Sequence, residues 1–180
     1  WDQETYLPNR GVETRGQQVS TLYRLAHQRL SSDEVGRLLD ALDGEVASLD
    51  FDSDPASLVR VTRRDYDRAV KVPADFVARW SAFGSHSFDA WTRARPSDDF
   101  AAMRPFLEKA LDFSRQYAHY LGPYARIADP LIEELDEGTT TASVMALFQE
   151  LRIALLPIVR AIVEQPVADD SYLRGAYPEA

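Results

Sequence analysis

The 180-residue chain contains no cysteine. Disulfide bonds, thiolate ligands for a metal and a cysteine nucleophile are therefore excluded within these residues. A chain without cysteine is also compatible with a reducing compartment. No basic start followed by an apolar stretch, the pattern of a signal peptide, is present at Trp1-Asp2 and the residues that follow. Together these absences predict a cytoplasmic protein.

Long hydrophobic runs are absent as well. The most apolar run extends from Ile153 to Val159, is interrupted by Pro157 and is flanked by Arg152 and Arg160. A membrane-spanning helix needs about 20 predominantly apolar residues. The run is much shorter than that, so the sequence predicts no interaction with a membrane.

Positive charge is scarce, with 20 Lys and Arg against 29 Asp and Glu and a formal net charge of −9. Such a surface repels phosphate backbones, which predicts no nucleic-acid partner. The densest basic patch has helical spacing and is interleaved with acids, which favours a solvated, salt-bridged helix face. Its members are Arg60, Arg63, Arg64 and Arg68, with Asp65 and Asp67 between them.

What the sequence does contain is helical periodicity, without any convincing strand pattern. Capping residues, glycines and prolines divide the chain into six or seven helices joined by short connections. This predicts an all-α, bundle-like fold in a single domain over residues 1–180. The expected helices are Val12–Leu30, one opened by Ser31 and Glu34 and stopped near Gly44, one from Asp54 to about Val72, one from Pro73 to near Arg95, one capped by Ser97-Asp98-Asp99 and ended by Gly122-Pro123, a short one around Ile127 to Gly138, and one capped by Thr139 to Thr141.

Two apolar stripes are prominent on these helices. One is aromatic and predicts a core face, with a groove for an apolar ligand as the alternative; it comprises Phe76, Val77, Trp80, Phe88 and Trp91. The other predicts the buried face of the last helix; it comprises Val144, Leu147, Phe148, Leu151, Leu155 and Ile162.

Catalytic and metal-binding motifs are missing. None of His27, His86 and His119 has a second histidine four residues later, so the zinc motif HExxH is absent. Phosphate-binding glycine loops and the GxSxG serine elbow are absent too. The sequence therefore predicts no catalytic, cofactor-binding or metal-ligating residue, and ordinary structural roles for the three histidines.

Two groups of acidic residues have spacings that could suggest cation binding. Asp50, Asp52 and Asp54 imitate the start of a calcium loop, but Pro55 and Val61 replace the required glycine and glutamate. Asp54 is better explained as a helix cap. A second group predicts a solvated acidic face, with attraction of a cation or a basic partner as the alternative; it comprises Glu133, Glu134, Asp136 and Glu137.

The opening WDQETYLP resembles the Trp-Asp-Gln-Glu-Thr-x-Met-Pro segment of the carboxypeptidase Taq family, with Leu7 in place of methionine. Further segments resemble that family in the same order. They are Gly11–Leu30, Arg63–Val77, Asp98–Gly122 and Thr139–Ile162. The stretch YARIADPLIEELDEG departs from the family, keeping Tyr124 and Gly138 but little else.

The resemblance implies a parent enzyme that uses zinc to release C-terminal amino acids from peptides. Nothing in this chain matches the family's zinc and substrate motifs, so no functional residue is carried over. The resemblance then implies an N-terminal helical segment that restricts substrate access, is inactive alone, and has as partners a peptide substrate, the missing catalytic half and a second copy in a homodimer. The alternative is a free-standing helical module that binds a peptide or a partner protein. A third interpretation is that the parent belongs to another group of helical zinc peptidases with a similar lid, such as the oligoendopeptidases. The opening motif WDQETYLP fits that group less well.

Overall fold

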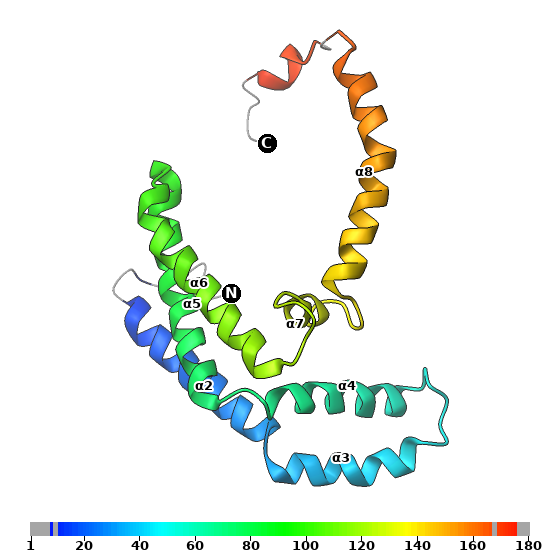
Figure 1. The fold of residues 1–180 in the computed structure, drawn as a ribbon. Helices are drawn as coiled ribbons and strands as arrows, with labels where there is room; N and C mark the ends of the chain where they lie inside the picture. Colours follow the sequence, from blue (N-terminus) through cyan, green and yellow to red (C-terminus); the bar gives the residue numbers. More distant parts are fainter. Residues whose placement is uncertain (1–7, 9–10, 167–168, 176–180) are drawn as a thin grey trace. The chain divides into compact units, whose positions relative to one another are not determined.

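The computed structural model describes residues 8, 11–166 and 169–175. These residues form seven α-helices and no strand. Figure 1 labels the helices along the chain. The predicted all-α class and number of helices are confirmed. The opening segment with Trp1, Asp2 and Leu7 lies outside the described residues. The helices are α2 (Val12–Leu30), α3 (Asp33–Val46), α4 (Asp54–Ala69), α5 (Ala74–Ala94), α6 (Phe100–Leu121), α7 (Asp129–Glu133) and α8 (Thr141–Val163), with short 3-10 helices η2 (Arg95–Ser97) and η3 (Ser171–Arg174).

The chain divides into two compact units, residues 1–131 and 132–180. The first unit holds α2 to α6 and the beginning of α7, and the second holds α8 and η3. In the first unit, α2 packs along α5, α5 packs on α6, and α3 packs on α4. The expectation of a single domain over 1–180 stays a prediction.

Several predicted helix ends are confirmed. Asp99 accepts a hydrogen bond from the Ala102 backbone N–H (3.0 Å) and begins α6. Gly122 caps the other end of this helix, directly before Pro123. Thr140 and Ser143 form a reciprocal capping box at the start of α8. Each of these devices satisfies backbone groups that a helix end leaves without an intrahelical partner.

Other boundaries differ from prediction by a few residues. Ser32, not Ser31, accepts the capping bond of α3, from the Val35 N–H. Ser53 precedes α4, so the expected cap Asp54 is already the first helical residue. The helices α3 and α4 end at Val46 and Ala69 rather than near Gly44 and at Val72, and α7 is limited to Asp129–Glu133. A continuing helix tolerates one unfavourable glycine when its neighbours pack, so local signals place ends only approximately.

The prolines inside the long helices do not end them. α6 continues through Pro105 and α8 continues through Pro157. A proline removes one donor and strains one turn. On either side of these positions the remaining backbone hydrogen bonds hold the helix together.

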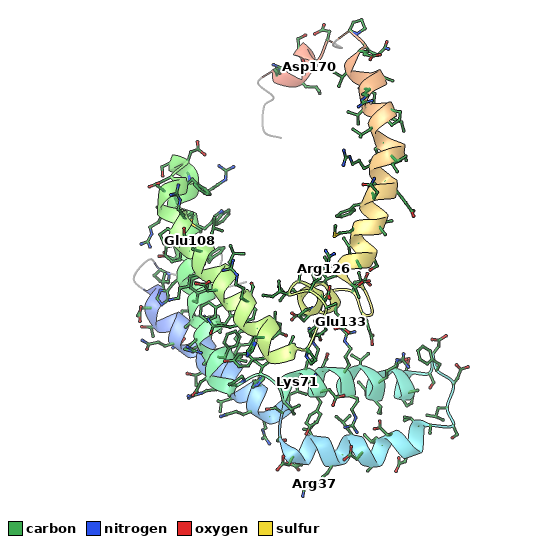
Figure 2. The ribbon with its side chains drawn as sticks, in the orientation of Figure 1. Arg37, Lys71, Glu108, Arg126, Glu133 and Asp170 are labelled. Atoms are coloured by element: carbon green, nitrogen blue, oxygen red, sulfur yellow. The ribbon has the colours of Figure 1, made fainter. Side chains whose placement is uncertain are left out.

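The predicted buried face of the last helix is exposed in this structure, which corrects that expectation. No residue of α8 is buried, and Leu147, Phe148 and Ile162 are each more than half exposed. Figure 2 shows side chains projecting from α8 along its whole length. Among the described residues of the second unit, α8 is the only long helix. Periodicity identified an apolar face correctly but could not supply the element that covers it.

The contact between α3 and α4 depends on a glycine. A Cβ added to Gly36 would lie 2.9 Å from Cζ of Tyr66 on α4, closer than side chains normally approach. Gly44 lies on the same helix, and a Cβ added there would meet nothing within 4 Å. The two glycines therefore separate the effect of packing from the effect of helix propensity.

We predict opposite effects for alanine at these two positions. Gly36→Ala should lower the free energy of unfolding by about 1–3 kcal/mol, because Tyr66 must move. Gly44→Ala should raise it by about 0.5–1 kcal/mol, because alanine favours the helix where space is free. Urea denaturation followed by circular dichroism measures both. A Gly36→Ala variant as stable as the Gly44→Ala variant would contradict the packing contact.

Candidate functional site

Phe76 is the centre of the hydrophobic core of the first unit. Its side chain is fully buried, and its ring centroid lies 5.4 Å from that of Trp80, 5.7 Å from Phe113 and 5.1 Å from Tyr120. All three contacts are edge-to-face, an arrangement that aromatic pairs favour. The core thus joins the beginning of α5 to the C-terminal half of α6 and gives the neighbouring surface a rigid support.

The aromatic stripe on α5 is core at its beginning and exposed at its end, and a groove for an apolar ligand stays a prediction. Phe76 is core and Trp80 packs against it, as predicted. Trp91 is 47% exposed and tilts against Phe88 at 5.9 Å between centroids. It borders a small hollow of about 290 Å³ between the end of α5 and the beginning of α6. Burial along the stripe therefore falls from Phe76, which is buried, through the partly buried Trp80 to Trp91, which is exposed.

A larger hollow, the α5–α6 groove, lies beside the aromatic core. Its volume is about 680 Å³. Its floor is aromatic and every titratable side chain on its rim is basic. The floor comprises Phe83, Phe106 and Phe113, and the rim comprises Arg79, His86 and Lys109.

The floor of the α5–α6 groove is built by ring packing. The Phe83 centroid lies 5.1 Å from that of Phe113 and 6.3 Å from that of Phe106. Lys109 Nζ lies 5.7 Å from the Phe83 centroid, within the range of a cation–π contact. An apolar floor with a positive rim suits a ligand that carries a carboxylate next to an apolar side chain. Nothing in the groove is arranged to break a bond.

The three histidines lie on three different helices and have different surroundings. His27 Nε2 lies 2.7 Å from the Val72 carbonyl oxygen, and since a carbonyl only accepts, this nitrogen donates the proton. His86 Nε2 lies 3.7 Å from a Glu13 carboxylate oxygen, and both side chains are substantially exposed. His119 is exposed. Asp89, which follows His86 on α5, pairs with Arg93 at 2.5 Å.

The basic patch on α4 is held by structural contacts, with partners other than those expected. Arg63 donates to Asp40 (2.7 Å) and to Asp43 (2.8 Å) on α3. The hydrogen bond to Asp40, with the nearby Asp43 charge, raises the pKa of Arg63 above its ordinary value. Arg68 donates to the Pro130 carbonyl oxygen at 3.0 Å. The patch ties α4 to its neighbours, which leaves little of it for an anionic partner.

Neither group of acids forms a metal site. Among the described residues, no three His, Asp or Glu side chains come together in a way that could hold a metal ion. Asp50 accepts from the Asp52 N–H (3.1 Å) and so shapes the turn before α4. Asp136 accepts from the Thr139 hydroxyl (2.7 Å) ahead of α8. Short polar side chains in turns commonly make such local bonds.

Comparison with known proteins supplies the identification. Residues 1–180 match the model of the family described as Carboxypeptidase Taq (M32) metallopeptidase. The chain belongs to the carboxypeptidase Taq family. The resemblance noted in the opening residues and in the later helices is thereby confirmed.

Curated relatives agree with this assignment. The chain is 30% identical over 190 residues to "Thermostable carboxypeptidase 1" of Thermus thermophilus, covering 99% of this chain and 37% of the relative. It is 26% identical over 180 residues to "Carboxypeptidase 1" of Bacillus subtilis, covering 99% of this chain and 36% of the relative. The chain therefore spans about a third of the length of the carboxypeptidases it matches.

Solved structures of the family have the same fold. The BsuCP crystal structure matches with a TM-score of 0.92 at 26% identity, covering 99% of this chain and 36% of that one. The structure of Pyrococcus furiosus carboxypeptidase in its Apo-Mg form matches with a TM-score of 0.71 at 29% identity, covering 91% and 32%. The described helices thus have the fold of the matching third of these carboxypeptidase structures.

The described residues do not fit the metal of a metallopeptidase. A catalytic metal needs three protein ligands and an open position. The three histidines of this chain lie apart, on α2, α5 and α6, and no acid cluster accompanies any of them. The ligands of the family's metal must therefore come from outside the described residues. The α5–α6 groove had no sequence motif that could have revealed it.

The aromatic core generates a prediction about stability. Phe76→Ala should lower the free energy of unfolding by about 3–5 kcal/mol, because it opens a cavity among rings that cannot collapse into it. Trp91→Ala removes a larger side chain but a half-exposed one, so its cost should stay near 1 kcal/mol. Thermal or urea unfolding of the chain measures both. Equal costs would mean that Phe76 is not the centre of the core.

Proposed function

We propose that this chain is the N-terminal helical segment of a zinc-dependent metallocarboxypeptidase that releases C-terminal amino acids from peptides. The proposal rests mainly on the match of residues 1–180 to the carboxypeptidase Taq family. Coverage of about a third of the relatives leaves room for a catalytic part elsewhere in the polypeptide. In this view the segment restricts access of substrate and contributes no reacting group.

The α5–α6 groove supports a role in access. A peptide that approaches a carboxypeptidase presents a free carboxylate and a series of side chains, many of them apolar. The groove offers a positive rim and an apolar floor to such a chain. Helices that wall a cleft in this way admit a flexible chain end and exclude a folded protein. The cytoplasmic location, the homodimer, and the absence of nucleic-acid and membrane partners expected from the sequence belong to the same proposal.

We expect the 180-residue chain alone to release no amino acid from a blocked dipeptide, with or without added Zn²⁺. The physical reason is that the described residues offer no three-ligand site to activate water. The full-length enzyme with the same segment is the positive control. Release of the C-terminal residue by the short chain above a buffer blank would overturn the proposal.

The access role has its own test in the full-length enzyme. Reversing the rim charges with Arg79→Glu and Lys109→Glu should lower kcat/KM for long acidic peptides by about two- to tenfold, as one or two exposed ion pairs would. Blocked dipeptides, which lack the further acidic side chains that the rim would attract, should change less than about twofold. Arg24→Glu with Arg37→Glu reverses two exposed charges on α2 and α3 and serves as the control. Equal losses on short and long substrates would contradict the access role.

A further inference from the structure

α8 is more apolar than a surface helix should be. Its 23 residues contain eleven large apolar side chains that are each at least 39% exposed. They are Met145, Leu147, Phe148, Leu151, Ile153, Leu155, Leu156, Ile158, Val159, Ile162 and Val163. Soluble proteins rarely leave so large an apolar surface uncovered, so a partner is required.

The apolar side chains of α8 are not confined to one stripe. Leu147 and Leu156 are nine residues apart, which is about two and a half helical turns, so they point in opposite directions. Ile153 and Ile162 have the same spacing and also point in opposite directions. A surface helix normally has one apolar stripe that faces a core. A helix that is apolar on opposite sides is normally enclosed by several elements.

A membrane could in principle enclose α8, because this helix alone among the described ones is long and apolar enough to span a bilayer. It extends well beyond the Ile153–Val159 run considered from the sequence. However, the middle residue of Thr141–Val163 is Arg152, with Glu150 half a turn away. A charge at the centre of a bilayer costs about 2.5–3.5 kcal/mol or more. In a protein core these two charges, which lie on opposite sides of the helix, can instead be paired with charges of the enclosing elements.

A second copy of the chain is a weaker candidate. One helix packed on another covers a single stripe, and Leu147 and Leu156 cannot both lie in it. The remaining two thirds of the carboxypeptidase polypeptide can supply several elements at once. The length of the matched relatives, of which this chain covers 36% to 37%, shows that such a partner is present in the family.

We propose that α8 is the docking helix of this segment, enclosed on at least two opposite sides by the part of the polypeptide beyond these 180 residues. The inference deepens the proposed function and rests on its premise that the segment belongs to a longer enzyme. Docking through α8 would stabilise the segment against the catalytic part, independently of whether the α5–α6 groove meets substrate.

The test is thiol labelling of the full-length protein with single cysteines at Leu147→Cys and Leu156→Cys. Because the segment has no cysteine, the protein without either substitution gives the background rate from cysteines elsewhere. Both introduced thiols should react about 100-fold more slowly in native protein than in urea, since labelling of an enclosed side chain needs local opening. Glu150→Cys, which points away from the centre of the apolar arc, is the matched control and should react faster than both.

The labelling rates decide whether α8 is enclosed by the rest of the polypeptide. Protection of both leucine positions at every protein concentration supports docking, and protection of the control as well would mean enclosure on all sides. Fast labelling at either leucine position overturns the proposal, as does protection that depends on protein concentration or on added lipid vesicles. Peptidase activity is not the readout. An inactive protein with both positions protected would therefore refute the proposed function but leave the docking helix standing.

Discussion

Burial of the Phe76 ring is the interaction on which the first unit depends. Phe76 opens α5, and the rings that enclose it come from the same helix and from α6. Further along α5, the opposite partner α2 approaches closely, since Gly16 and Ser85 are both buried and a Cβ on Gly16 would lie 3.4 Å from Ser85 Cβ. α5 is therefore packed against a bulky aromatic neighbour on one side and a small-residue neighbour on the other. Two hollows of the unit lie along α5 and α6, a third borders α2 and α5 beside Phe76, and a fourth lies at the end of α6.

Much of the fold was predictable because helix signals are local. Apolar spacing predicted Val12–Leu30 with both ends correct, and Asp99, Gly122 and Thr140 act at the ends they were expected to mark. Ends that depend on competing neighbours were predicted less well. Ser31 and Ser32 are both able to cap α3, and only three-dimensional geometry decides between them. Ser32 accepts from Val35, while the Ser31 hydroxyl donates to the His27 carbonyl at 2.8 Å.

The surface chemistry was less predictable because its partners are distant in sequence. The α4 arginines were expected to pair with Asp65 and Asp67 beside them, yet Arg63 pairs with Asp40 and Asp43, more than 19 residues earlier. The α5–α6 groove likewise joins Arg79 and His86 to Lys109 across two helices. No spacing rule within one helix could indicate such a set. What the sequence could provide was the absence of a metal motif and the family resemblance of the opening residues.

The contrast between α5 and α8 shows how an incomplete set of packing partners is recognised. Both helices have apolar residues at helical spacing, and both were expected to bury them. α5 has its partners α2 and α6 within the chain, so Phe76 and Ala94 are buried. α8 has none among the described residues of its own unit, so residues of the same type stay exposed. The apolar face of α8 is therefore exposed because no described element of its unit covers it, and not because its sequence pattern differs from that of α5. In the docking proposal, the apolar pattern is what calls for a partner, and the extent of the face around the helix sets how many elements that partner must supply.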